Sequence, residues 1–537
     1  MSTSFGNHLK NLGEVVARFD AKSDASKLRT LQQVAHCRLP ATKALINYCD
    51  LLLFLQAMPP NKNVLLAAQN EMGRVSRFLA SSVRRSDPCL INSGLPFTTQ
   101  VSKFSHDLIT WLVDGQACRL EIDRFEDAAF DLNQILATTL PTLERSVTTS
   151  GYTNEELLHE LGLRKGDEVP FLLNELKALN ERPRVTDLLF DGLGMYLKIL
   201  PKNRTFSRAY NVVPVVNPFF HDGILKEFDQ RELLDRALPK ASDHSSATKS
   251  QFIRAVKLAL VLTDRETDPV TYMDERTFRV YELERGITIA IYGMVPSRQM
   301  PLESYIGYTL FKNGYPAAYG GAWVFGERAD FGINIFEPFR GGESGYLMCQ
   351  LLRVFRQVFN VEHFEIEPYQ FGLDNPDGIA TGAFWFYHKH GFRPIDKELL
   401  KLSEKEVVRR KKNKGHRTSS ATLTRFTESN MALTMKKDQR TGVYDITNKV
   451  KRLIRATYKG NRTHAEAESA KKFLKRTGLR PVHGPDEIRV LQEVALWAEA
   501  LRVTDARKLA LLKRMVTIKP IDPYGYQELL LRFFKKV

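Results

Sequence analysis

Cysteine, long apolar runs and a secretion signal are what this sequence has least of. Its five cysteines are scattered over 537 residues, and none are spaced as CxxC, so neither a disulfide framework nor a structural zinc site is expected. The longest apolar runs, such as LLLFLQAM at 51–58, fall far short of the roughly 20 residues that span a bilayer. The N-terminus lacks a basic segment followed by an apolar one. We therefore expect a cytoplasmic chain without a membrane partner.

Positive charge is concentrated in one part of the chain. The segment from Lys397 to the end holds 34 Lys and Arg against 15 Asp and Glu, a net charge of +19, whereas the preceding residues carry a net charge of −3. A basic tail of this kind favours an acidic partner, of which nucleic acid is the commonest. The alternative is a set of solvated, lysine-rich helices, because no aromatic residues are interleaved with the charges.

The outer parts of the chain show helical periodicity. Apolar residues recur at spacings of three and four within 1–240, which predicts a helical N-terminal domain. Residues 403–421, which include RRKKNKGHRTSSA, are expected to form a basic flexible linker. Residues 422–537 are predicted to form a basic helical C-terminal domain.

The middle of the chain, 250–400, has a different pattern. From Arg276 onward, short segments rich in β-branched and aromatic residues are separated by turn signals, which predicts a mostly antiparallel meander. The last of these strands, DFGINIF, leads into FRGGESGY at 339–346 and then into an amphipathic helix. A strand, a helix and a closing strand follow. A glycine-rich turn between a strand and a helix is a potential phosphate site, because exposed N–H groups and the helix dipole favour an anion.

This order of elements resembles the GNAT acyltransferase superfamily over roughly 276–395. The resemblance is carried by RGGESG at the start of the central helix and by GAFWFYHKHGF near the end of the domain. It implies an α+β fold with a mixed, mostly antiparallel GNAT-like sheet, flanked here by the N-terminal and C-terminal helical domains. It also implies acetyl-CoA, or another acyl-CoA, as co-substrate, and an amine-bearing acceptor. The expected cofactor-binding residues are Arg340, Gly341, Gly342, Ser344, Gly345 and Asn375.

Two positions depart from the family pattern. Glu343 stands where the turn usually has a glycine, and Ala380 stands where an asparagine often touches the cofactor, which leaves Asn375 as the nearest substitute. Two like charges about 4 Å apart repel by roughly 4 kcal/mol at an effective dielectric near 20. Coenzyme A therefore requires that Glu343 turns away from the turn. The alternative is a tight turn with a helix-capping glutamate.

Tyr387 is the candidate general acid. The run FYHKHGF at 386–392 matches the family's aromatic-Tyr-x-Lys/Arg-x-Gly-Phe pattern, in which the tyrosine can protonate the departing thiolate. The alternative is a tyrosine that only packs in the core. No arrangement of ligands in the sequence indicates a metal site.

Glu365 and Glu367 are the candidates for handling the amine. Alternation along HFEIE at 363–367 puts both glutamates on one face of a strand, either beside the acceptor or at a plain solvent surface. Asp330 and Glu337, on the preceding strand, are equally arguable candidates for this role. The sequence thus predicts direct acyl transfer from coenzyme A to an amine in a ternary complex. Its rivals are a non-catalytic GNAT-like binding protein and a protein that binds nucleic acid through its basic C-terminal region.

Overall fold

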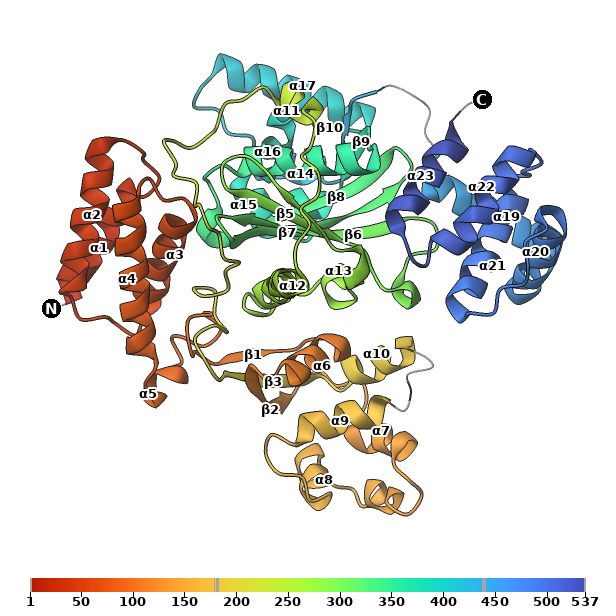
Figure 1. Cartoon of the computed structure of the whole chain (residues 1–537), viewed down its shortest axis with the longest axis horizontal. Coiled ribbons are helices and arrows are strands. Elements are labelled where there is room, and N and C mark those ends of the chain that lie inside the picture. The colour runs from red at the N-terminus through yellow and green to blue at the C-terminus, as the bar shows by residue number, and fades with distance from the viewer. Residues whose placement is uncertain (1, 178, 180–182, 437–440, 536–537) are drawn as a thin grey trace.

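The computed structural model describes residues 2–177, 179, 183–436 and 441–535. Its N-terminal part is a bundle of helices: α1 (Ser2–Val15), α2 (Ala21–Ala35), α3 (Lys43–Ala57), α4 (Lys62–Leu79) and the short α5 (Ser82–Arg85). Asp20 and Asn61 cap α2 and α4 by accepting hydrogen bonds from backbone amides three residues later. α3 packs on α4, and the hydroxyl of Tyr48 donates to the buried carboxylate of Glu71 between them. The bundle stands at one end of the central sheet (Figure 1).

A second unit in the N-terminal region contains strands that the helical pattern did not predict. The strands are β1 (Gln100–Ser102), β2 (Cys118–Phe125) and β3 (Met195–Pro201), and they pair antiparallel in the order β1-β3-β2. The surrounding helices are α6 (His106–Gly115), α7 (Leu132–Thr139), η1 (Arg145–Thr149), α8 (Asn154–Glu160), α9 (Glu168–Lys177) and α10 (Pro183–Gly192). β3 alternates between buried and half-buried residues, but half of the residues of β2 are charged, which hides its period. The prediction of a helical N-terminal domain over 1–240 therefore did not include these three strands.

The central sheet has eight strands in the order β10-β11-β9-β8-β7-β6-β5-β4. They are β4 (Arg279–Glu282), β5 (Ile287–Tyr292), β6 (Ser304–Lys312), β7 (Tyr315–Phe325), β8 (Arg328–Ile335), β9 (His363–Ile366), β10 (Arg393–Pro394) and β11 (Met431–Thr434). Strands β4 to β8 form an antiparallel meander, and only β8 and β9 run parallel. The predicted α+β class with a mixed, mostly antiparallel sheet flanked by helical regions is confirmed.

The parallel pair diverges partway along its length. Register partners join Arg328–Asp330 to His363–Glu365, and β8 then continues to Ile335 paired only with β7. Because β9 ends at Ile366, the second half of β8 has a free edge facing away from β7. That edge leads directly to the glycine-rich turn.

Helices cover both faces of this sheet (Figure 1). On one face lies α14 (Ser344–Phe359), whose Phe355 contacts the rings of Tyr308 and Phe331. The same side carries α11 (Gln230–Asp235), α15 (Pro376–Thr381) and α16 (Ala383–Lys389). On the other face, α12 (Ser246–Val261) packs Phe252 edge-on against Phe311 of β6, next to α13 (Asp268–Thr271). Short 3-10 turns complete the domain: η2 (Glu275–Thr277), η3 (Pro296–Arg298), η4 (Glu337–Phe339) and η5 (Pro368–Phe371).

The predicted flexible linker over 403–421 is wrong. α17 (Lys397–Lys412) and α18 (Ser420–Phe426) occupy most of it, and β11 follows as a strand of the central sheet. Glu406 explains why this segment is folded, because its buried carboxylate accepts hydrogen bonds from Arg409, His416 and Thr418. The run of exposed lysines and arginines hid one buried face of α17. The central domain therefore extends to β11 rather than ending near 400.

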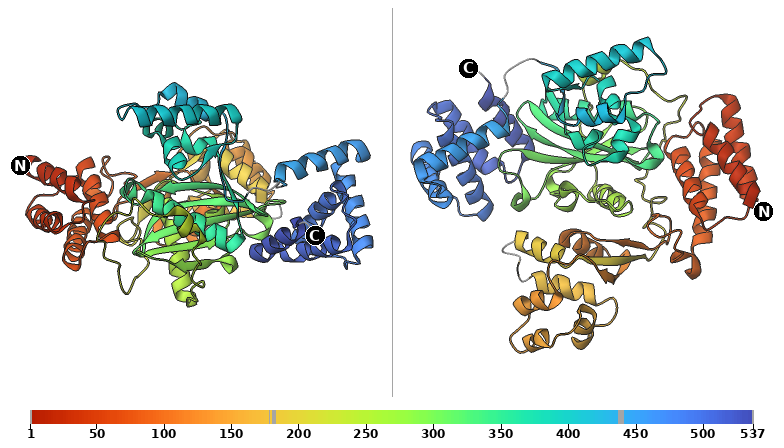
Figure 2. Two further views of the ribbon diagram at one scale, coloured as in Figure 1. Left: turned by 90° about the horizontal axis from the view of Figure 1, so that it is seen from above. Right: turned by 180° about the vertical axis from the view of Figure 1, so that it is seen from behind.

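The C-terminal region is helical, as predicted. It contains α19 (Val443–Tyr458), α20 (Arg462–Thr477), α21 (Pro485–Ala500), α22 (Ala506–Ile518) and α23 (Pro523–Phe534). α23 attaches these helices to the sheet, since the Gln527 side chain bonds both polar groups of the Gly326 backbone and the carbonyl of Phe359. Figure 2 shows the N-terminal and C-terminal helices at opposite ends of the sheet. No described helix has the length and apolarity needed to cross a bilayer.

Candidate functional site

The glycine-rich turn lies between the end of β8 and the start of α14. Gly341 has a left-handed φ of 75°, which favours glycine, and it is exposed. Gly345 is required for a different reason: a Cβ there would lie 2.3 Å from the His390 ring. Arg340 is exposed and donates from Nε to the Ile335 carbonyl. Gly342, Ser344 and Gly345 are half-buried, so the sequence-predicted residues form one contiguous turn with an accessible rim.

Glu343 points into the interior rather than toward the rim. Its side chain is 1% exposed, and its carboxylate lies 2.7 Å from the Lys312 ammonium and 2.6 Å from the Arg285 guanidinium. It also accepts from the Leu225 backbone amide. Despite its burial, these cations and the amide hold the pKa of Glu343 below its usual value. Asp222 also pairs with Arg285 at 3.7 Å. Two carboxylates therefore face two cations, and the charge of Glu343 is compensated within the interior.

Sequence reasoning missed both cations. Lys312 is the last residue of β6, before an Asn-Gly turn, and Arg285 lies in the turn between β4 and β5. A hairpin tip and a tight turn, 31 and 58 residues from Glu343 along the chain, meet at one point. The spacing of these residues in the sequence does not indicate that their side chains contact one another.

A segment of the N-terminal region covers one side of the start of α14. Phe228 contacts the ring of Tyr346 edge-on, with centroids 5.3 Å apart, and stacks on His390 at 6.2 Å. Gln230 donates to the His390 carbonyl. This cover leaves Arg340 and Gly341 exposed, so any ligand at the turn approaches from their side.

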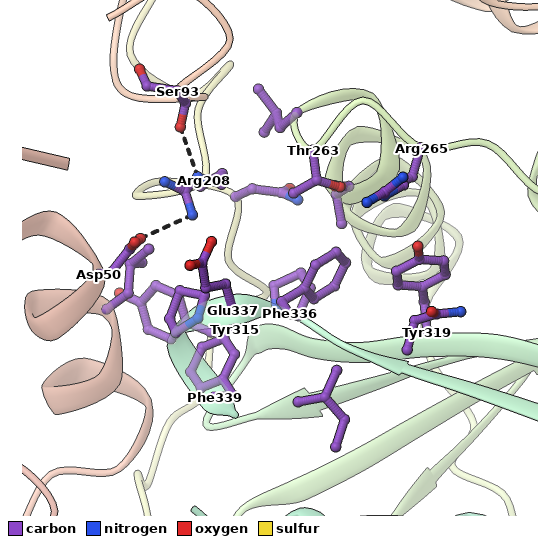
Figure 3. A pocket seen from close by; sticks show the side chains of 18 of the residues that line it. Asp50, Ser93, Arg208, Thr263, Arg265, Tyr315, Tyr319, Phe336, Glu337 and Phe339 are labelled. Atoms are coloured by element: carbon purple, nitrogen blue, oxygen red, sulfur yellow. Dashed lines mark hydrogen bonds and ion pairs between the residues drawn. The ribbon is translucent and has the colours of Figure 1, made fainter. Parts of the chain in front are cut away.

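A cavity of about 340 Å³ opens beside Arg340 (Figure 3). One wall comes from the N-terminal region and α12, and the opposite wall comes from β7 and the chain after β8. The wall residues include Asp50, Ser93, Arg208, Asn211, Thr263, Arg265, Tyr315, Tyr319, Asn334, Phe336, Glu337, Phe339 and Arg340. Arg208 pairs with Asp50 at 2.9 Å and donates to the Ser93 carbonyl. Burial raises the pKa of Asp50, with Glu337 adding to the effect and Arg208 opposing it.

Tyr387 reaches the free edge of β8 through Gln370. The Tyr387 hydroxyl donates to the Gln370 side-chain oxygen at 3.3 Å, and the same oxygen accepts from the Ile333 amide at 3.3 Å. Ile333 belongs to the part of β8 that β9 no longer pairs. The phenol is buried, and burial raises its pKa well above the ordinary value. Tyr387 is thus a core residue whose hydroxyl is connected to the backbone amide of Ile333 through the Gln370 side chain. Gln370 had no sequence signal.

Glu365 and Glu367 occupy different surroundings. The buried carboxylate of Glu365 pairs with Arg328 and with the His363 ring, and these partners hold its pKa below the usual value despite burial. Glu367 is exposed at the end of β9. His363 and Glu365 touch through their side chains, which agrees with the predicted common face.

Asp330 sits beside Glu365 in the parallel register. Burial, together with Glu365 and Glu367, raises the pKa of Asp330 to about 7. Its antiparallel neighbour Trp323 stacks on Tyr305 with ring centroids 4.3 Å apart. We call Tyr305, Trp323, Asp330, Glu365 and Glu367 the acidic-aromatic patch. It combines carboxylates with aromatic faces, the two groups that attract a cation.

Asn375 does not join the glycine-rich turn. It caps α15 by accepting from the Gly378 amide, and its side-chain nitrogen donates to the Tyr369 carbonyl. Both polar ends of the amide are therefore in use. Within the described residues, no group of three or more His, Cys, Asp and Glu side chains is placed to hold a metal ion.

Comparisons with protein-family models, curated proteins and solved structures gave no match to this chain.

Proposed function

We propose that this chain transfers an acyl group, with acetyl as the first candidate, from acyl-CoA to an amine acceptor in a ternary complex. The observation that carries the proposal is the diverging pair β8 and β9, whose free strand edge leads into a glycine-rich turn at the start of α14. Arg340, Gly341, Gly342, Ser344 and Gly345 would hold the diphosphate through backbone amides and one guanidinium. The inward ion pairs of Glu343 support this assignment, because they remove the expected repulsion.

The bound coenzyme would supply a thioester whose acyl carbon accepts the amine nitrogen. The Ile333 amide, on the free edge of β8, would polarise the thioester carbonyl once the Gln370 oxygen leaves it. Tyr387 holds a proton at its hydroxyl throughout the neutral pH range, since its pKa is raised. It would give that proton to the sulfur as the carbon–sulfur bond breaks, and would recover one from the attacking nitrogen, which loses a proton when the amide forms. Gln370 therefore has to shift when the strand edge is occupied.

The acidic-aromatic patch is the proposed acceptor side. A cationic amine suits its carboxylates and the stacked rings of Tyr305 and Trp323. Asp330 is the base in this scheme, because its pKa of about 7 lets it take a proton from an ammonium near neutral pH. Glu365 is already paired with Arg328 and His363. Its contribution, with that of Glu367, is negative charge that attracts the acceptor.

The test is calorimetric titration of the full chain with coenzyme A, alongside release of free thiol from acetyl-CoA with spermidine, lysine methyl ester and tyramine as acceptors. Arg340→Gln is expected to weaken coenzyme A binding, and Arg77→Gln, which changes an exposed arginine on α4, is the matched control. Absence of binding at millimolar coenzyme A would end the proposal. Binding without thiol release for any acceptor would favour the non-catalytic binding protein.

A second candidate function is binding of nucleic acid by the C-terminal region. Lys451, Arg452, Arg455 and Lys459 are exposed on α19 or at its end, and none of them forms an ion pair with a described residue. Unpaired cations along one helix suit a phosphate backbone, whose binding releases counterions. This function is compatible with acyl transfer to a molecule carried on RNA or DNA.

A further inference from the structure

The cavity beside Arg340 joins two parts of the chain that lie far apart in sequence. Asp50 comes from α3, whereas Phe336 and Glu337 follow β8. Figure 3 shows Asp50 and Arg208 at one end and Arg265 at the other, above Tyr319. Removing the N-terminal helices would therefore leave the cavity without one of its walls.

Asn211 lines the cavity, and its side-chain oxygen is a buried hydrogen-bond acceptor without a donor among the described residues. The residue is 2% exposed, and its side-chain nitrogen donates to the Ala255 carbonyl at 2.9 Å. Its Oδ1 is buried and has no hydrogen-bond partner among the described residues. A buried polar atom left unpaired costs free energy, so such atoms usually have a partner in the functional state. An N–H or O–H group on a ligand would supply that partner.

The other residues of the wall suit a ligand that has a flat ring and an anionic group. Tyr319 and Phe336 lie with ring centroids 5.1 Å apart and, with Tyr315, provide aromatic surface. Three arginines line the cavity against two carboxylates, Asp50 and Glu337, and Arg208 already neutralises Asp50. Arg265 and Arg340 are exposed at the rim. A volume of about 340 Å³ is in the range of small-ligand sites.

We propose that this cavity binds the nucleotide end of coenzyme A, its adenosine 3′-phosphate, and that the N-terminal helices are therefore part of the cofactor site. This inference rests on the proposed acyl transfer. Arg340 both opens the glycine-rich turn and lines the cavity, so a diphosphate on the turn and an adenosine in the cavity belong to one continuous ligand. The adenine amino group would donate to Asn211 Oδ1, and Arg265 would meet the 3′-phosphate. Glu337 is left to accept from the ribose hydroxyl, a common role for a carboxylate.

The experiment titrates the full chain with three probes: coenzyme A, 3′-dephospho-coenzyme A and adenosine 3′,5′-bisphosphate. Asn211→Leu should weaken coenzyme A and the bisphosphate about ten-fold each, as expected for the loss of one hydrogen bond of about 1.4 kcal/mol. Arg265→Gln should abolish the preference for coenzyme A over its dephospho form. Arg77→Gln should change none of these affinities. Arg265 is exposed, so its replacement keeps the test valid if Asn211→Leu fails to fold.

The outcomes separate this inference from the proposed function. Bisphosphate binding that is lost in Asn211→Leu, without any acyl transfer, supports the inference and refutes the transfer. Wild-type affinity for coenzyme A in both variants overturns the inference and leaves the transfer standing. Altered KM for the amine with unchanged coenzyme A affinity also overturns it, because the cavity would then hold the acceptor. Binding of neither nucleotide probe by the unaltered chain overturns both.

Discussion

Replacing Lys312 by methionine removes one of the two cations that hold Glu343 in the interior. Lys312 and Glu343 are each 1% exposed, and 2.7 Å separates their charged atoms. Breaking a buried ion pair from one side costs about 3–5 kcal/mol, because the remaining charge stays buried and unpaired. Arg285 still contacts Glu343, so we expect the lower end, about 3 kcal/mol of unfolding free energy. Methionine has a similar length and leaves little empty volume.

Differential scanning calorimetry measures this effect as a shift of the transition that contains the central domain. For a unit of about 150–250 residues, about 3 kcal/mol corresponds to a fall of roughly 6–12 °C in Tm. Lys389→Met, which replaces an exposed lysine on α16, is the matched control and should shift Tm by much less. The double variant Lys312→Met/Glu343→Gln should regain part of the loss, because no uncompensated carboxylate remains.

The pH dependence gives the same prediction a second test. Because the pKa of Glu343 is held below its ordinary value of 4.5, its ion pairs stabilise the fold above that value. The stabilisation is lost as the pH falls through the lower, folded-state pKa. Burial lowers the pKa of Lys312 to about 8, so both partners are charged only below that value. The Tm difference between the unaltered chain and Lys312→Met should therefore be constant between the two folded-state pKa values and shrink in acid. A Lys312→Met shift no larger than that of the control, or a difference that grows in acid, would refute the reasoning.

The remaining predictions concern Tyr387, Asp330 and two exposed cations of α19. Tyr387→Phe should lower kcat at least about ten-fold, a modest loss for removing a general acid, with unchanged coenzyme A affinity; unaltered turnover would exclude the phenol as the acid. Because Asp330 must be ionised to accept a proton and its pKa is about 7, kcat/KM for the amine should rise through that pH, and Asp330→Asn should remove this limb of the profile. Asp330→Asn should also raise Tm at about pH 8, since a raised folded-state pKa means stability lost as the pH rises. Changing Lys451 and Arg455 to Gln should reduce the slope of log affinity for single-stranded RNA against log salt by about 0.7 for each phosphate that is no longer neutralised; an unchanged slope would exclude α19 from the interface.

Local pattern was sufficient for the central antiparallel meander and for the turn. Alternation and turn signals after Arg276 predicted the antiparallel meander, and FRGGESGY predicted a turn that opens a helix. Both depend on neighbouring residues, whose periodicity and backbone preferences are visible along the chain. Charge density was misleading at 403–421, because exposed lysines and arginines of α17 concealed the buried Ser403 and Glu406.

The partners of individual side chains were not predictable in this way. Whether Glu343 would repel a diphosphate at the glycine-rich turn depends on Lys312 and Arg285, which contact its carboxylate from two separate turns. The raised pKa of Asp330 comes from burial and from Glu365, across a strand pair that is three residues long. Such effects depend on distance and burial in three dimensions, and sequence separation does not encode either one.

The sequence by itself determined an α+β chain with helical flanks, a basic C-terminal region and a glycine-rich turn between a strand and a helix. Tertiary structure decided that Glu343 faces inward, that Tyr387 meets the strand edge through Gln370, and that the N-terminal helices complete a cavity beside Arg340. The physical reason is that periodicity is a local property of the chain. Charge compensation, burial and cavity shape arise only where distant segments pack together.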